Sequence, residues 1–355
     1  MEDQIAIPKI KKEFSWDNYH ERQIAIRLAY IGWNLHGFTY QDKTNDTVEY
    51  YLFEALVKAK LIKDPKNCNY SLCGRTDAGV SGVGNVVSVR VRSICPTGKG
   101  AIKKQGAKEQ KEEMNYAQIL NGILPEIIRV TGIAYVDLNF NARFMCNSRG
   151  YRYFFHLLSM DVDRMREAAS FLIGEHDYRA FCKFSPASTS HCVRRIDKIE
   201  MGNAGNGIWF FEIVGSGFIW HQIRCIAYIL FTVGKGLEKP SITQELLDIK
   251  KYPGRPNYHI ADPEPLVFWK AYFEGVEWFI DCEIESKVKA NFARQLVDMD
   301  IKAAVLRCFA DGDIPDAIVK KYTPISKLEI GKSVEQIIEE YRKEKNMLPV
   351  DNNDE

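Results

Sequence analysis

The chain has 355 residues, of which 46% are hydrophobic, and this length predicts about two domains. The composition excludes a collagen, a coiled coil and a wholly disordered chain. Residues 276–355 carry 12 basic and 17 acidic side chains, whereas residues 1–275 carry 36 basic and 30 acidic side chains. A mildly basic body with an acidic tail fits a nucleic-acid-binding protein, and it equally fits an ordinary solvated surface.

Two strands, a helix and a polar insertion are predicted in the first third of the chain. Period-two alternation predicts strands over residues 24–30 and 87–91, the first half-buried and the second with a polar, basic face. Asn45-Asp46 predicts the cap of a helix over residues 48–59. Residues 96–113 hold five Lys, three Glu and three Gly, a composition typical of a mobile surface insertion.

The rest of the chain mixes strands and helices without the regular alternation of a doubly wound sheet, which predicts an α+β fold with mostly antiparallel strands. Helices are predicted at 115–124, 161–172 and 221–233, and strands at 151–158, 208–214 and 267–273. The expected organisation is an N-terminal extension over 1–21, a first domain over 22–135, a second domain over 136–275 and a mainly helical extension over 276–355 whose end, 347–355, is disordered.

The cellular environment is constrained by the cysteines and by the absence of long apolar runs. Nine cysteines are scattered without a CxxC pair, which favours free thiols in the nucleus and/or cytoplasm over disulfides or a zinc site. No run approaches the roughly 18–20 apolar residues of a membrane-spanning helix. We also expect no secretory signal, because the first twelve residues are polar and charged.

The stretch from Cys73 to Val80, CGRTDAGV, is the most unusual in the sequence. Two glycines flank Arg75, Thr76 and Asp77, so that the backbone can turn sharply and expose these side chains. An aspartate on a rigid loop can act as a nucleophile or a general base, and Arg75 suits contact with a phosphate or a base. The alternative is a simple turn with solvated charges.

Arginines alternate with aromatic residues in two neighbouring stretches, 140–144 and 148–153. This pattern is typical of a surface that stacks bases and holds phosphates. In a strand, Tyr151 points to one face and Arg152 to the other, so an aromatic core face with a solvated arginine face is the alternative. Candidates for RNA-backbone contacts are Arg143, Arg149 and Arg152, followed by Arg194 and Arg195.

A glycine-rich turn at residues 215–217 leads into an apolar helix that carries His221 and Arg224. A buried arginine needs a carboxylate partner, for which Asp77 is available. Alternatively, Arg224 extends to solvent. His221 is predicted to be a hydrogen-bonding group at the helix start.

Taken together, these stretches resemble the TruA family of tRNA pseudouridine synthases, in order and spacing, over residues 22–275. Within the family, the chain is most similar to the eukaryotic enzymes that modify uridines 38 and 39 of the tRNA anticodon arm. Ser81-Gly82, Gly150 and Cys225 depart from the common family pattern. The matching segments are 74–80, 140–144, 149–153, 174–181 and 217–224, with 218–225 and 264–267 carrying the similarity to the eukaryotic branch.

The resemblance implies two ferredoxin-like domains joined in one mixed, largely antiparallel sheet with a central basic cleft. It implies that Asp77 is catalytic, that Tyr151 stacks on the uracil, and that Arg224 orients Asp77. Arg75 would help to extrude the target base. It also implies uridine isomerisation without a cofactor or metal, tRNA as partner, and a homodimer.

Other functions stay open on the sequence alone. One is the same chemistry at another tRNA position or on another RNA. Others are a catalytically silent tRNA-binding or chaperone protein on the same fold, and a general RNA-binding module. Whether Asp77 acts as nucleophile or base is also open.

Overall fold

The computed structural model describes residues 14–187, 191–310 and 322–345, so the expected disordered end at 347–355 lies outside the described residues. Within them, ten strands form one sheet. The strands are β1 His20–Tyr30, β2 Ser71–Leu72, β3 Ser81–Ser93, β4 Ala101–Ile102, β5 Ile128–Tyr135, β6 Ser148–His156, β7 Gly174–Asp177, β8 Val193–Gly205, β9 Ile208–Gly215 and β10 Leu266–Tyr272. The helices are α1 Val48–Lys58, α2 Tyr116–Asn121, α3 Val162–Ser170, α4 Gln222–Gly234, α5 Ile242–Leu246, α6 Cys282–Phe309 and α7 Val334–Glu344.

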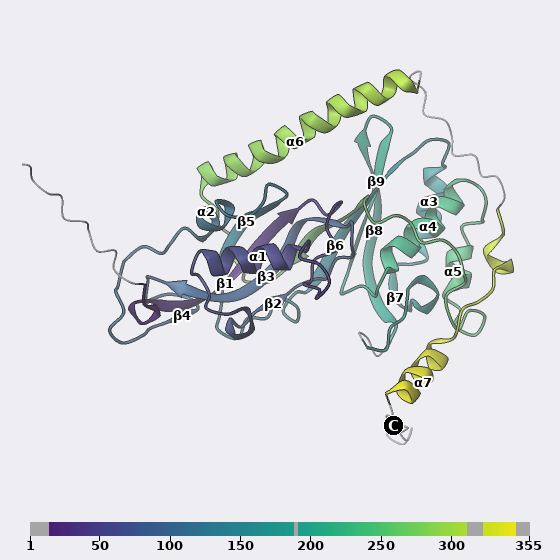
Figure 1. The fold of residues 1–355 in the computed structure, drawn as a ribbon. Coiled ribbons are helices and arrows are strands. Elements are labelled where there is room, and N and C mark those ends of the chain that lie inside the picture. Colours follow the sequence, from purple (N-terminus) through teal and green to yellow (C-terminus); the bar gives the residue numbers. More distant parts are fainter. Residues whose placement is uncertain (1–13, 188–190, 311–321, 346–355) are drawn as a thin grey trace, which may run out of the picture.

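The sheet confirms the predicted α+β class and continues without a break from β4 to β7, with α3, α4 and α5 beyond its β7 end (Figure 1). Its order is β4-β1-β3-β10-β6-β9-β8-β7, with β5 paired to β1 and β2 paired to β3. The β10–β3 pair is parallel and the other pairs are antiparallel. The late strand β10 therefore lies between β3, which comes from the first part of the chain, and β6, which comes from the part after residue 136.

Two hydrophobic clusters pack against the sheet. One includes Ile24, Ile26 and Leu28 of β1, and the other includes Ala25 of the same strand. The prediction of a half-buried strand at 24–30 is therefore wrong, because a second layer covers its other face. The polar face expected on β3 is also covered in part: Ser88 is buried, and its hydroxyl lies 2.7 Å from that of Ser71.

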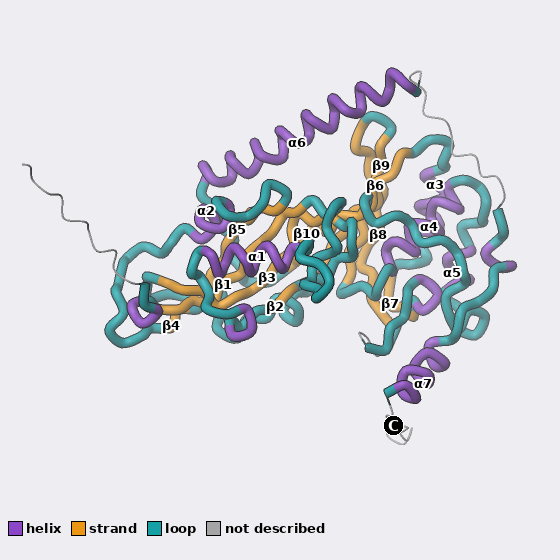
Figure 2. Tube along the Cα trace, in the orientation of Figure 1, coloured by secondary structure: helices purple, strands orange, loops and turns teal. Residues whose placement is uncertain are grey.

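The helices confirm the main sequence predictions, with shifts at their ends. α1 is capped by Thr47, whose hydroxyl accepts from the Tyr50 amide, and not by Asn45-Asp46. The predicted C-terminal helical extension contains α6 and α7, and α6 crosses above the sheet with its far end standing apart from it (Figures 1 and 2). None of the helices in the described ranges has the length and apolar character to span a membrane.

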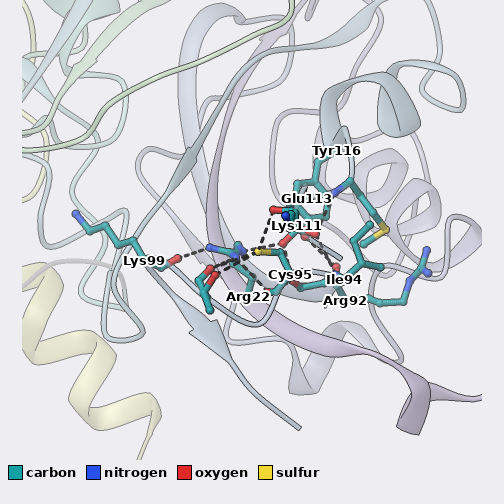
Figure 3. Close-up of polar contacts among 11 residues, drawn as sticks. Arg22, Arg92, Ile94, Cys95, Lys99, Lys111, Glu113 and Tyr116 are labelled. Carbon is teal, nitrogen blue, oxygen red and sulfur yellow. Dashed lines mark hydrogen bonds and ion pairs between the residues drawn. The ribbon is translucent and has the colours of Figure 1, made fainter. Parts of the chain in front are cut away.

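The segment 96–113 contains the short strand β4 and ends in a buried ion pair, features that its polar composition did not predict (Figure 3). The Arg22 Nε donates to Glu113 Oε2 at 2.8 Å, and the two side chains are only 2% and 6% exposed. Glu113 also accepts from the amides of Ile94 and Met114, while Arg22 donates to the carbonyl of Lys99. This network ties both ends of the segment to β1.

Replacing Glu113 with Gln should lower the free energy of unfolding by about 3–5 kcal/mol, because the substitution leaves the buried Arg22 charge without its partner. Urea titration followed by circular dichroism measures the change. Glu283→Gln is the matched control, since Glu283 pairs with Lys287 in the open and its loss should change the free energy of unfolding only slightly. Equal small changes in both variants would contradict the stabilising role of the buried pair.

Candidate active site

The loop that carries Asp77 connects β2 to β3 and is held by short-range packing and hydrogen bonds. The Thr76 hydroxyl lies 3.0 Å from that of Tyr30, and the Asn85 side chain donates to the Gly74 carbonyl at 2.8 Å. Gly79 has φ +83°, and a Cβ there would meet Pro263 at 2.9 Å. The glycine is therefore required both for the turn and for the close approach of Pro263, which lies just before β10.

The Asp77 carboxylate meets two side chains from the start of α4. Its Oδ2 lies 3.6 Å from Arg224 Nη1 and 3.4 Å from His221 Nε2. Burial raises the pKa of Asp77, while Arg224 and the Trp220 indole partly offset this effect by stabilising the carboxylate. The structure thus brings the predicted Asp77 and Arg224 together. Arg224 is also fixed by donation from its Nε to the Ala261 carbonyl at 2.7 Å, and so does not extend to solvent.

His221 occupies the N-cap position of α4 but forms no capping hydrogen bond with its side chain, so the predicted helix-start role is wrong. Its backbone has φ +63°, a left-handed conformation that costs a non-glycine residue about 1–2 kcal/mol. The imidazole turns instead toward Asp77. Sequence patterns carry no signal for this conformation.

Tyr151 lies in a row of paired residues that crosses the centre of the sheet. It pairs with Phe268 of β10 and with Ile213 of β9, and Phe268 pairs in turn with Gly82 of β3. Its ring packs edge-on against Phe268 and Phe218, with centroids 4.9 and 5.3 Å away. The same ring lines the cleft beside Asp77.

Arg149 links three loops around the site. Its guanidinium donates to the carbonyls of Cys73, Cys146, Ser216 and Arg143, at distances from 2.6 to 3.3 Å. These bonds use its donors within the protein, so Arg149 acts first as a scaffold for the Asp77 loop. No sequence pattern indicates this role, because the four carbonyls come from segments that only the fold brings together.

The other arginines fall into two groups. Arg75, Arg143 and Arg194 line the cleft together with Arg149 and Arg224. Arg152 lies away from these lining residues, paired with Glu212 at 2.8 Å and placed over the Trp269 ring at 3.6 Å. Arg195 likewise pairs with Asp197 outside the cleft lining.

The cleft has a volume of about 1340 Å³ and is basic, since five arginines line it against the carboxylates of Asp77 and Glu49. This agrees with the predicted central basic cleft. Sequence reasoning missed Trp220 and Lys183, which stand beside Asp77 and help to stabilise its charge. In the described part of the chain, no group of three or more His, Cys, Asp or Glu side chains is arranged to hold a metal ion.

Comparison with known proteins gives a consistent result. The family model described as tRNA pseudouridine synthase matches residues 168–274. The tRNA pseudouridine(38/39) synthase of Homo sapiens is 40% identical over 80% of this chain and 62% of its own length, and that of Saccharomyces cerevisiae is 32% identical over 95% and 81%. The tRNA pseudouridine synthase A of Thermococcus sibiricus is 31% identical over 80% and 97%.

The chain spans 62 to 66% of the length of the mammalian relatives it matches. It covers most of the Saccharomyces cerevisiae protein and nearly all of the Thermococcus sibiricus protein at more than 30% identity. This likeness confirms the resemblance inferred from the motifs: the chain belongs to the tRNA pseudouridine synthase family.

Proposed function

We propose that this protein isomerises uridine to pseudouridine at positions 38 and 39 in the anticodon stem of tRNA. The observation that carries the proposal is the partly buried Asp77 carboxylate, held by Arg224 beside Tyr151 in a basic cleft. The names of the Homo sapiens and Saccharomyces cerevisiae relatives support the two target positions.

RNA binding in the cleft would rest on phosphate contacts and stacking. Arg75 and Arg143 are exposed, and Arg75 makes no hydrogen bond or ion pair with other residues of the described chain, so its guanidinium is available for RNA. Phe144 is 78% exposed at the edge of the same cleft, where it can stack on a base. Arg75 lies two residues before Asp77 and is placed to help a paired uridine leave the stem. Extruding a base from the helix costs a few kcal/mol.

The reaction needs no external group, because its atoms balance within the nucleotide. The N1–C1′ bond breaks, the uracil rotates, and a C5–C1′ bond forms. The proton lost from C5 is matched by the one that N1 gains. Asp77 would start the reaction by attacking C1′ or by removing a ribose proton, and either role requires the ionised carboxylate that Arg224 favours.

Tyr151 would stack on the rotating uracil. Burial raises the pKa of its hydroxyl far above the ordinary value, so the hydroxyl keeps its proton at neutral pH. In this resting state Tyr151 can donate a hydrogen bond or a proton.

Asp77→Asn should abolish pseudouridine formation while tRNA affinity persists, because phosphate contacts dominate RNA binding. The measurement is pseudouridine mapping of tRNA made without modifications, incubated with each protein. The variant should be at least as stable as the wild type at pH 7, because burial disfavours the carboxylate and the neutral amide avoids that cost. Turnover by pure Asp77→Asn would overturn the role of Asp77, and products outside the anticodon arm would overturn the target. A wild type that binds without product would indicate a silent tRNA-binding protein.

The pH dependence of kcat should show an acid limb above the ordinary aspartate pKa of about 3.9. The sign follows from burial, which raises the pKa of Asp77, so the carboxylate is protonated and inactivated earlier as the pH falls. Arg224→Ala should move this limb to still higher pH, because Arg224 lowers the pKa of Asp77. An acid limb at the same pH in both proteins would contradict the ion pair.

We further propose a homodimer, with the free end of α6 in the interface. The N-terminal part of α6 is anchored, since Asn291 donates to the Glu126 carbonyl and accepts from Arg129. Among the described residues, no side chain of residues 296–309 makes a hydrogen bond to a residue outside α6. Six large apolar side chains there are 53 to 83% exposed: Leu296, Val297, Ile301, Val305, Leu306 and Phe309.

The spacing of these residues supports a second copy as the occupant. Val297, Ile301, Val305 and Phe309 recur every four residues and form one stripe along the helix. Burying six such side chains yields on the order of 10 kcal/mol, which is comparable with the cost of association. An isologous pair would cover the same stripe on both copies.

The double variant Ile301→Glu/Val305→Glu should convert a dimer to a monomer, because it places charges in the apolar stripe. Light scattering after size-exclusion chromatography reports the mass. Ile249→Glu is the matched control, as Ile249 is also exposed but lies after α5. A monomeric wild type, or a double variant that stays dimeric, would contradict this interface.

The location is proposed to be the nucleus and/or cytoplasm. All nine cysteines are free thiols and seven are buried, which suits a reducing compartment.

A further inference from the structure

His221 is held in an unusual backbone conformation beside the catalytic aspartate. Of the five non-glycine residues with positive φ in the described chain, His221 is the one that lines the cleft. The turn around it is fixed by Gln222, whose side chain accepts from the Ile219 amide at 2.9 Å. The backbone carbonyl of His221 accepts the first hydrogen bond of α4, which the Cys225 amide donates at 2.9 Å. Strain of this kind, maintained by its surroundings, is typical of functional sites.

The imidazole has one nitrogen in contact and one without a partner. Nε2 lies 3.4 Å from Asp77 Oδ2, and the side chain is 12% exposed. Nδ1 is buried and meets no hydrogen-bond partner among the described residues. An ionised carboxylate only accepts hydrogen bonds, so a hydrogen bond across this contact needs the proton on Nε2, which leaves Nδ1 bare. In this tautomer the nitrogen without a partner, Nδ1, carries a lone pair and no N–H.

The charges around His221 keep it in this neutral form. Burial lowers its pKa to about 4, and the nearby cations Arg224, Lys183 and Arg255 lower it as well. Asp77 is the acidic group that faces it. A second proton would also place a buried N–H at Nδ1 without an acceptor. At neutral pH, His221 is therefore a hydrogen-bond donor without charge.

We propose that His221 is a positioning residue that donates its Nε2–H to Asp77 and aligns the carboxylate for attack on the ribose. Both His221 and Arg224 reach the same oxygen, Oδ2. The long 3.4 Å contact is expected to shorten once substrate fills the cleft, as catalytic hydrogen bonds often do. This inference rests on the proposed role of Asp77.

The test compares three variants. His221→Gly removes the imidazole and relieves the left-handed strain. His221→Asn keeps an N–H donor on a residue that tolerates this conformation. Lys60→Gly is the matched control, because Lys60 also has positive φ but lies just after α1, away from the cleft.

His221→Gly should lower kcat about 10- to 100-fold, the range expected from a small misplacement of a reacting group, with an unchanged KM for tRNA and no loss of melting temperature. Its acid limb should move to higher pH, because the carboxylate loses a donor. His221→Asn should recover part of the lost kcat, and Lys60→Gly should keep the wild-type rate. Wild-type kcat with an unmoved limb in His221→Gly would overturn the proposal, as would a lowered melting temperature in both His221 variants.

A second readout is independent of turnover. The pKa of Asp77 can be measured by carbon NMR of protein labelled at the aspartate carboxyl carbons, with Asp77→Asn providing the assignment. We expect a higher pKa in His221→Gly than in the wild type, and an equal pKa would refute the contact. Because this titration needs no RNA, an inactive wild type would refute the proposed function while the NMR result still decides the role of His221.

Discussion

The site depends on a short parallel pairing between β3 and β10, in which Ser81 faces Val267 and Gly82 faces Phe268. The Asp77 loop ends at β3, and Phe268 pairs on its other side with Tyr151. This pairing therefore sets the distance between the aspartate and the tyrosine, although they come from different parts of the sheet. Gly82 is needed in this row, because a Cβ there would meet the Tyr30 ring at 2.6 Å.

The charge of Asp77 reflects a balance between burial and a small number of donors. Removing a carboxylate from water disfavours its ionised form, and Arg224 and Trp220 recover part of that cost. A fully solvated aspartate would hold its charge more easily but would be a weaker nucleophile or base, since water would occupy its lone pairs. The geometry at the start of α4 thus keeps the group ionised and yet available.

Much of the architecture follows from local pattern, and most of the site from a resemblance. The strands at Ile24–Tyr30 and Ile208–Val214 and the helix after Asp161 are visible in the sequence because apolar spacing records which face is buried. Pattern alone could not show that both faces of β1 are covered, because the second layer comes from residues far along the chain. The left-handed turn at His221 and the scaffold role of Arg149 were also out of reach, since each depends on carbonyls and loops that only the fold brings together. For Arg152 the sequence pattern was sufficient: the alternation correctly placed its side chain on the other face of the strand from Tyr151. The ion pair with Glu212 then accounts for its charge.

The central place of β10 has a consequence for how the chain is made. During synthesis, β1 and β3 leave the ribosome long before β10 does, so the edge of β3 beside the Asp77 loop stays open while the intervening strands and helices appear. Open strand edges invite wrong pairing, and contacts between distant segments form slowly. On this edge β2 pairs with β3 at Val87 and Ser88, while Ser81 and Gly82 receive their strand partner from β10. A nascent chain that ends between residues 225 and 265 would carry both Asp77 and Arg224 and still lack β10, the strand that sets them against Tyr151.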